Sequence, residues 1–136
     1  MKNDDIVLIA NMDRDEAGHL ADIIASAGYP SQACHSLADM MNVLAESSFM
    51  AVLLDIDSLD IDNRSIRSLT LAYPDVCFLC TSRDRFHPEL KEALCYHLFA
   101  CINKPVDPDE LIYWIRCIRD NQTDSRDPPA DDEIEA

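Results

Sequence analysis

Three short apolar segments without polar interruption stand out along the chain, at residues 6–10, 49–54 and 76–80. None of them alternates apolar with polar positions, so each is typical of a strand that is covered on both faces, as in a parallel sheet. Two weaker segments, at 31–34 and 98–103, predict two further strands.

Between these segments, apolar residues recur at helical spacing in five stretches. These stretches are residues 17–24, 37–44, 66–73, 90–94 and 111–118. Helix-ending signals such as Gly28 and Pro74, and the helix start Asp107-Pro108, bound several of them. The strand–helix alternation predicts a doubly wound α/β domain of five parallel strands and five helices with right-handed crossovers.

The composition changes this picture only at the end of the chain. A length of 136 residues fits one domain, and 48% hydrophobic residues are enough for a core. Residues 121–136 hold six acidic residues, one Arg and two Pro. We therefore predict a domain over 1–120 and an acidic, disordered tail over 121–136.

The charge excludes one class of partner. Lys and Arg number 11 against 26 Asp and Glu, a formal net charge of −15 that disfavours nucleic acid.

The apolar run at 49–54 is too short for a membrane helix, and that at 6–10 is too short for a secretory signal. A cytoplasmic protein without a membrane partner, with its six cysteines reduced, is expected.

Polar residues follow the clearer strands and are expected to meet at one edge of the sheet. Asn11 follows the first strand, Asp55 the third and Thr81 the fourth, while Lys104 follows the fifth. A carboxylate nucleophile, a hydroxyl donor and an ammonium suit an anionic group the size of a phosphate.

At these positions the chain resembles a bacterial response-regulator receiver domain of the chemotaxis-regulator type. The resemblance rests on residues 52–62 (VLLDIDSLDID), 78–82 (FLCTS) and 101–106 (CINKPV), with 73–76 (YPDV) in support. It implies a flavodoxin-like sheet in the strand order 2-1-3-4-5, flanked by five helices.

The resemblance also implies roles for individual residues. Asp55 would accept a phosphoryl group from the phosphohistidine of a sensor histidine kinase or phosphotransfer protein. Thr81 and Lys104 would contact that group, and Cys101 stands at the aromatic switch position three residues before the Lys. The domain would be a signalling module rather than an enzyme, with at most self-catalysed phosphorylation and dephosphorylation.

Magnesium is the cofactor that the resemblance implies. Its ligands would be Asp55 and the backbone carbonyl of Asp57, with Asp13 and Asn11 reached through water. The family usually carries two adjacent acids at the end of the first strand, where this chain has Asn11 and Met12. A thioether suits a hard cation poorly, and without the two acids the formal charge of the site falls to near 0, that of Asp55 with Lys104. We therefore expect weakened Mg²⁺ binding.

Two functions remain open at this point. The first is a stand-alone receiver in two-component or phosphorelay signalling. It would signal to a downstream protein through its fourth helix, fifth strand and fifth helix, a face that would also suit a homodimer. The alternative is an atypical receiver that binds proteins independently of phosphorylation, an interpretation favoured by Asn11 and Met12.

Overall fold

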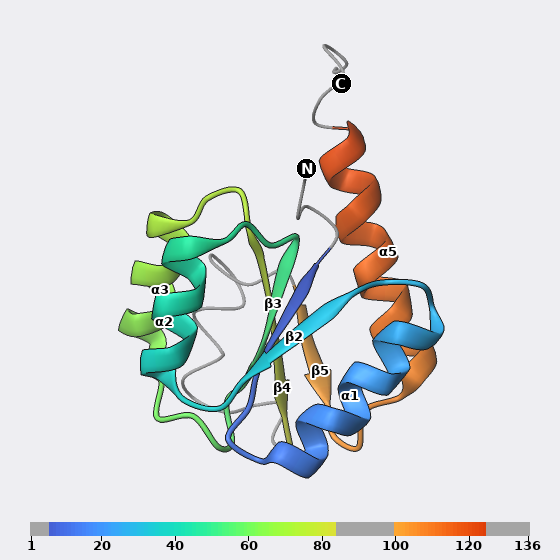
Figure 1. Cartoon of the computed structure of the whole chain (residues 1–136), viewed down its shortest axis with the longest axis horizontal. Coiled ribbons are helices and arrows are strands. Elements are labelled where there is room, and N and C mark those ends of the chain that lie inside the picture. Colours follow the sequence, from blue (N-terminus) through green and yellow to red (C-terminus); the bar gives the residue numbers. More distant parts are fainter. Residues whose placement is uncertain (1–5, 84–99, 125–136) are drawn as a thin grey trace.

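The structure is a computed structural model that describes residues 6–83 and 100–124 of the chain. The described elements alternate between strands and helices, apart from the adjacent β4 and β5 (Figure 1). Their bounds are β1 Val7–Ala10, α1 Arg14–Ser26, β2 Ser31–Cys34, α2 Leu37–Glu46, β3 Ala51–Asp55, α3 Asn63–Ala72, β4 Cys77–Ser82, β5 Ala100–Asn103 and α5 Pro108–Asp124.

All five strands form one parallel sheet in the order β2-β1-β3-β4-β5, which confirms the predicted sheet. Helices α1 and α5 cover one face of the sheet, and α2 and α3 cover the other (Figure 1). This arrangement explains why the central strands β1 and β3 are buried at every position and apolar except for Asp55, since neither of their faces meets water.

The apolar residues of the strands divide between two cores. Leu8, Val52 and Phe78 pack toward α2 and α3, whereas Ile9 and Leu53 pack toward α1 and α5. Because side chains alternate along a strand, the register of neighbouring strands fixes which residues share a face. Any residue that follows a strand is therefore placed by the packing of the strand before it.

Side-chain caps determine where three helices begin. Asp13, Ser36 and Asp62 each accept a hydrogen bond from a backbone N–H in the first turn of α1, α2 and α3, respectively. Gly28 follows the end of α1 with φ of 90°, a left-handed conformation that favours glycine, as predicted from its position.

The predicted fourth helix, around residues 90–94, lies outside the described residues, which contain four helices rather than five. Helix α5 continues to Asp124, so the first four residues of the predicted tail are helical. Among the described residues, no helix is both long and apolar enough to cross a membrane.

The buried central strand provides a test of the fold. Replacing Leu53, 1% exposed on β3, by Ala should lower the free energy of unfolding by about 2–5 kcal/mol because it leaves a cavity between the sheet and α1. The matched control is Leu71→Ala on α3, where the side chain is 69% exposed and little should change. Urea denaturation of both variants measures the difference, and equal losses would contradict the described packing.

Candidate functional site

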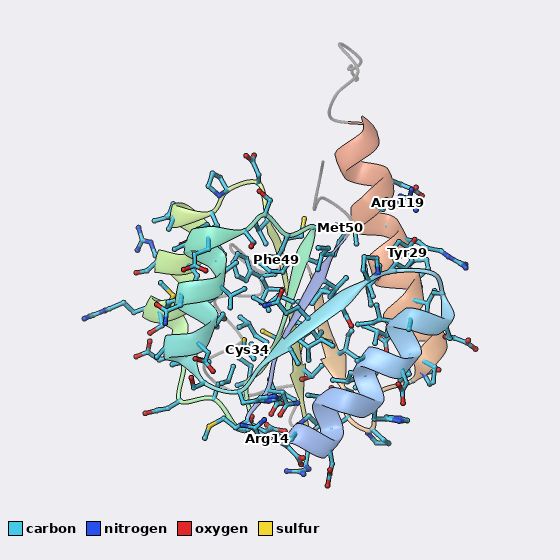
Figure 2. All side chains as sticks on the ribbon, viewed as in Figure 1. Arg14, Tyr29, Cys34, Phe49, Met50 and Arg119 are labelled. Carbon is cyan, nitrogen blue, oxygen red and sulfur yellow. The ribbon has the colours of Figure 1, made fainter. Side chains whose placement is uncertain are left out.

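The candidate site lies at the carboxyl edge of the sheet, where the predicted residues Asp55, Thr81 and Lys104 come together. In Figure 2, Arg14 at the start of α1 marks this end of the molecule, and Phe49 and Met50, which precede β3, mark the opposite end. Thr81 is the register partner of Asp55 on the neighbouring strand. Two in-register strands therefore bring the carboxylate and the hydroxyl to the same face.

Asp55 is 2% exposed, and described groups contact both of its carboxylate oxygens. Oδ1 accepts a hydrogen bond from Thr81 Oγ1 at 3.0 Å and lies 2.5 Å from Lys104 Nζ. Oδ2 accepts from the backbone N–H of Ser58 at 3.0 Å. A buried carboxylate is costly unless it is paired and hydrogen-bonded, and Asp55 meets both conditions.

Lys104 contacts two further carboxylates besides Asp55. Its Nζ lies 3.1 Å from Glu16 Oε2 and 3.3 Å from Asp57 Oδ2. Burial alone would lower the pKa of Lys104, but hydrogen bonds and charge attraction to Asp55 and Glu16 outweigh it and raise the pKa. One ammonium thus faces three carboxylates, which leaves two negative charges uncompensated and corrects the near-zero site charge expected from the sequence.

Asp57 joins the loop after β3 to the end of β4. Its carboxylate accepts hydrogen bonds from Ser82 Oγ at 3.0 Å and from the backbone N–H of Arg83 at 2.9 Å. Burial would raise the pKa of Asp57, but these hydrogen bonds and the charge of Lys104 together lower it. The prediction assigned only the backbone carbonyl of Asp57 to the site, so the contribution of its side chain was missed.

Asn11 and Ser58 link the end of β1 to the loop after β3. Asn11 Oδ1 accepts from the Asp13 N–H at 2.8 Å and from Ser58 Oγ at 3.3 Å, and Ser58 Oγ accepts from the Met12 N–H. Since Asn11 Oδ1 receives a backbone donor, the orientation of the amide is set. Its buried Nδ2 has no hydrogen-bond partner among the residues that the structure describes, which leaves an N–H donor beside the Asp55 strand.

The residues at the end of β1 do not fit a magnesium site of the family type. Asp13 is exposed, and its Oδ1 caps α1 by accepting from the N–H groups of Asp15 and Glu16. Met12 is 55% exposed and offers only a thioether. Within residues 6–83 and 100–124, no group of three His, Cys, Asp or Glu side chains is arranged to hold a metal ion.

Cys101 lies away from this cluster in the sheet. It is the register partner of Cys80, and both pack toward the core beneath α2 and α3, whereas alternation turns Asp55 and Thr81 to the other face. The burial of Cys80 raises the pKa of its thiol well above the ordinary value, so the thiolate is disfavoured there. The switch role of Cys101 stays a prediction.

Comparison with solved structures identifies the fold. The chain superposes on a response-regulator receiver domain protein (CheY-like) from Methanospirillum hungatei with a TM-score of 0.80 and 19% identity, over 88% of this chain and 97% of that one. A signal receiver domain of an HD domain-containing protein from Pseudomonas fluorescens gives a TM-score of 0.78 at 15% identity, over 87% and 96% of the two chains.

A structure described as an adenylate cyclase from Rhodopirellula baltica is also similar, with a TM-score of 0.79 and 17% identity over 90% of this chain and 92% of that one. The sequence matches no protein-family model and no curated protein. The chain therefore has the fold of a response-regulator receiver domain. Because similar folds carry different functions, the fold alone does not assign a function to the chain.

The contacts of Asp57 predict how stability depends on pH. A carboxylate whose pKa is lowered by folding stabilises the folded state above its unfolded pKa, and this contribution is lost as the pH falls through the folded pKa. The decrease in unfolding free energy between about pH 6 and about pH 3 should thus be smaller in Asp57→Asn than in the wild type. Denaturation across this range measures it, with the exposed Asp60→Asn as the control, and parallel pH profiles would contradict the prediction.

The end of β1 predicts a response to magnesium. About 10 mM Mg²⁺ should raise the Tm of the wild type only slightly, because Asn11 and Met12 supply no carboxylate and so weaken binding of the ion. The double variant Asn11→Asp/Met12→Asp places two acids beside Asp55 and should gain a few degrees in Mg²⁺. An equal rise in both proteins would show that the wild type binds the ion through other groups.

Proposed function

We propose that this chain is a receiver in two-component or phosphorelay signalling and that Asp55 accepts a phosphoryl group from a phosphohistidine. The observation that carries the proposal is the pairing of the buried Asp55 carboxylate with the Thr81 hydroxyl and the Lys104 ammonium. The receiver fold of its structural relatives agrees with this assignment.

Phosphoryl transfer requires the protein mainly to position the reacting groups and to stabilise negative charge. A carboxylate oxygen of Asp55 forms the new bond to phosphorus as the bond from phosphorus to the histidine nitrogen breaks, and the imidazole leaves with that electron pair. Negative charge on the phosphoryl oxygens is then stabilised by the Lys104 ammonium and the Thr81 hydroxyl, which already converge on Asp55. The donor would be a sensor histidine kinase or a phosphotransfer protein.

The output of such a receiver is a change in protein–protein contact. The acidic charge of the chain disfavours nucleic acid as a direct target, so a downstream protein is the proposed partner. Helix α5 and strand β5, together with the predicted fourth helix, form the proposed contact face, which would also serve a homodimer. We assign no conventional enzymatic activity to the domain.

A second candidate function is a protein-binding module that works independently of phosphorylation. One observation favours it: the end of β1 carries Asn11 and Met12, and Asp13 is used as a helix cap. The two functions differ in their response to beryllofluoride, a phosphoryl mimic. Only a working phosphoacceptor site should bind it, with a change in the spectrum of the protein.

Phosphorylation is tested by incubation with acetyl phosphate and Mg²⁺ followed by intact-mass spectrometry. The wild type should gain a single adduct of about 80 Da, the mass of one phosphoryl group. Asp55→Asn should lose the adduct because it removes the nucleophile. Asp60→Asn, which removes an equal charge from an exposed position in the following loop, should retain it.

Failure of the wild type to form an adduct with acetyl phosphate would not suffice to reject the proposal, because the proposed donor is a protein. The same proteins are therefore incubated with a panel of phosphorylated histidine kinases and phosphotransfer proteins. Absence of the adduct with every donor would reject phosphorylation on Asp55 in favour of the second function.

A further inference from the structure

Three carboxylates pair with Lys104, those of Asp55, Asp57 and Glu16. The receiver resemblance assigns no role to Glu16. It lies in the first turn of α1, 88 residues before Lys104 in the chain, yet its two carboxylate oxygens lie 3.1 and 3.3 Å from Lys104 Nζ. The side chain of Glu16 is 24% exposed and that of Lys104 is 9% exposed. The contact is therefore partly shielded from water and is screened less by salt than a surface pair.

Both ends of this contact are fixed by the backbone. Asp13 caps α1 by accepting a hydrogen bond from the Glu16 N–H at 3.2 Å, which positions the first turn beside the site. The Lys104 N–H donates to the carbonyl of Ser82 at 3.0 Å, which fixes the end of β5 against β4. The pairing of Glu16 with Lys104 thus joins two anchored elements rather than two mobile surface side chains.

A phosphoryl group on Asp55 would need the same ammonium. In the unphosphorylated protein, Lys104 pairs with Asp55, Asp57 and Glu16 at the same time. No second Lys or Arg is paired with these carboxylates among the described residues. Phosphorylation replaces the charge of Asp55 by a group of greater negative charge. Glu16 then both competes for Lys104 and repels the new group. Glu16 and Asp57 both reach Asp55 only through the lysine, but the Asp57 carboxylate also accepts hydrogen bonds from Ser82 and the Arg83 N–H, whereas among the described residues the Glu16 carboxylate contacts Lys104 alone.

We propose that Glu16 is a positioning residue that holds Lys104 in the unphosphorylated state and limits the phosphoryl occupancy of Asp55. This inference rests on the function proposed above. It assigns to α1 a restraint on the site that must be released, by movement of Glu16, before Lys104 fully pairs with the phosphoryl oxygens.

The test compares Glu16→Gln with Asp15→Asn in the full chain. Both variants remove one negative charge from the first turn of α1, but the exposed Asp15 makes no described contact with Lys104. At a fixed concentration of acetyl phosphate below saturation, the ratio of phosphorylated to unphosphorylated Glu16→Gln protein should exceed that of the wild type by about fivefold or more. Asp15→Asn should stay within about twofold, and Asp55→Asn gives the background.

Salt separates the contact from a general charge effect. At about 0.5 M NaCl the small effect of Asp15→Asn should vanish, whereas that of Glu16→Gln should persist because the pair is partly buried. A merely structural role for Glu16 would alter the Tm without changing the phosphorylated fraction. Melting curves of the three proteins therefore accompany the labelling.

A double-mutant cycle supplies a readout that needs no phosphorylation. The free energies of unfolding of Glu16→Gln, Lys104→Met and the double variant should be non-additive, because each single change breaks the same pair. Additive values would show that Glu16 and Lys104 do not interact, which overturns the inference alone.

The labelling outcomes separate the two proposals further. Equal labelling of Glu16→Gln and Asp15→Asn, with a labelled wild type, would reject the role of Glu16 and leave the proposed function standing. Absence of labelling in every protein with every donor, despite a non-additive cycle, would reject phosphorylation and the inference that rests on it.

Discussion

The ammonium of Lys104 is the charge on which the carboxyl edge of this sheet depends. A carboxylate as buried as Asp55 is costly without a partner, and Lys104 pairs with it while also bridging Glu16 and Asp57. Lys104 follows the edge strand β5, so it reaches Asp55 on β3 only across the width of β4. The hydrogen bond from the Lys104 N–H to the Ser82 carbonyl fixes this approach. Strand order and register are therefore conditions for the electrostatics of the site.

The two apolar cores enforce that register. Leu53 and Leu54 point to opposite faces of β3, each into a different core, so a shift of the strand by one residue would exchange their environments and turn Asp55 away from Thr81. The site itself contributes a buried charged pair, whose attraction is largely offset by the cost of removing both charges from water. Packing thus supplies the stability and sets the geometry of the carboxyl edge.

The sequence predicted most of this arrangement because parallel strands end at one edge. Asp55, Thr81 and Lys104 each end an apolar segment, and their convergence follows from the fold class alone. Glu16 and Ser58 were missed, because an acid in the first turn of a helix is equally well explained by the helix dipole, and a loop serine carries no pattern. The position of Cys101 was harder to predict for another reason. Three residues before Lys104, it is expected close to the site, but the alternation of side chains along β5 turns it toward the core beneath α2 and α3.

The positions of the carboxylates around Asp55, more than their total charge, determine what the site attracts. An acidic pair at the end of β1 would add two charges beside Asp55, and this chain instead brings Glu16 and Asp57 to the site, so the excess is similar. Acids at the end of β1 would present free oxygens to a cation. Glu16 and Asp57 instead direct theirs to Lys104, and Asp57 also binds Ser82 and the Arg83 N–H. The same formal charge therefore favours a metal in one arrangement and pairs with a lysine in the other, because the fold determines which groups each carboxylate contacts.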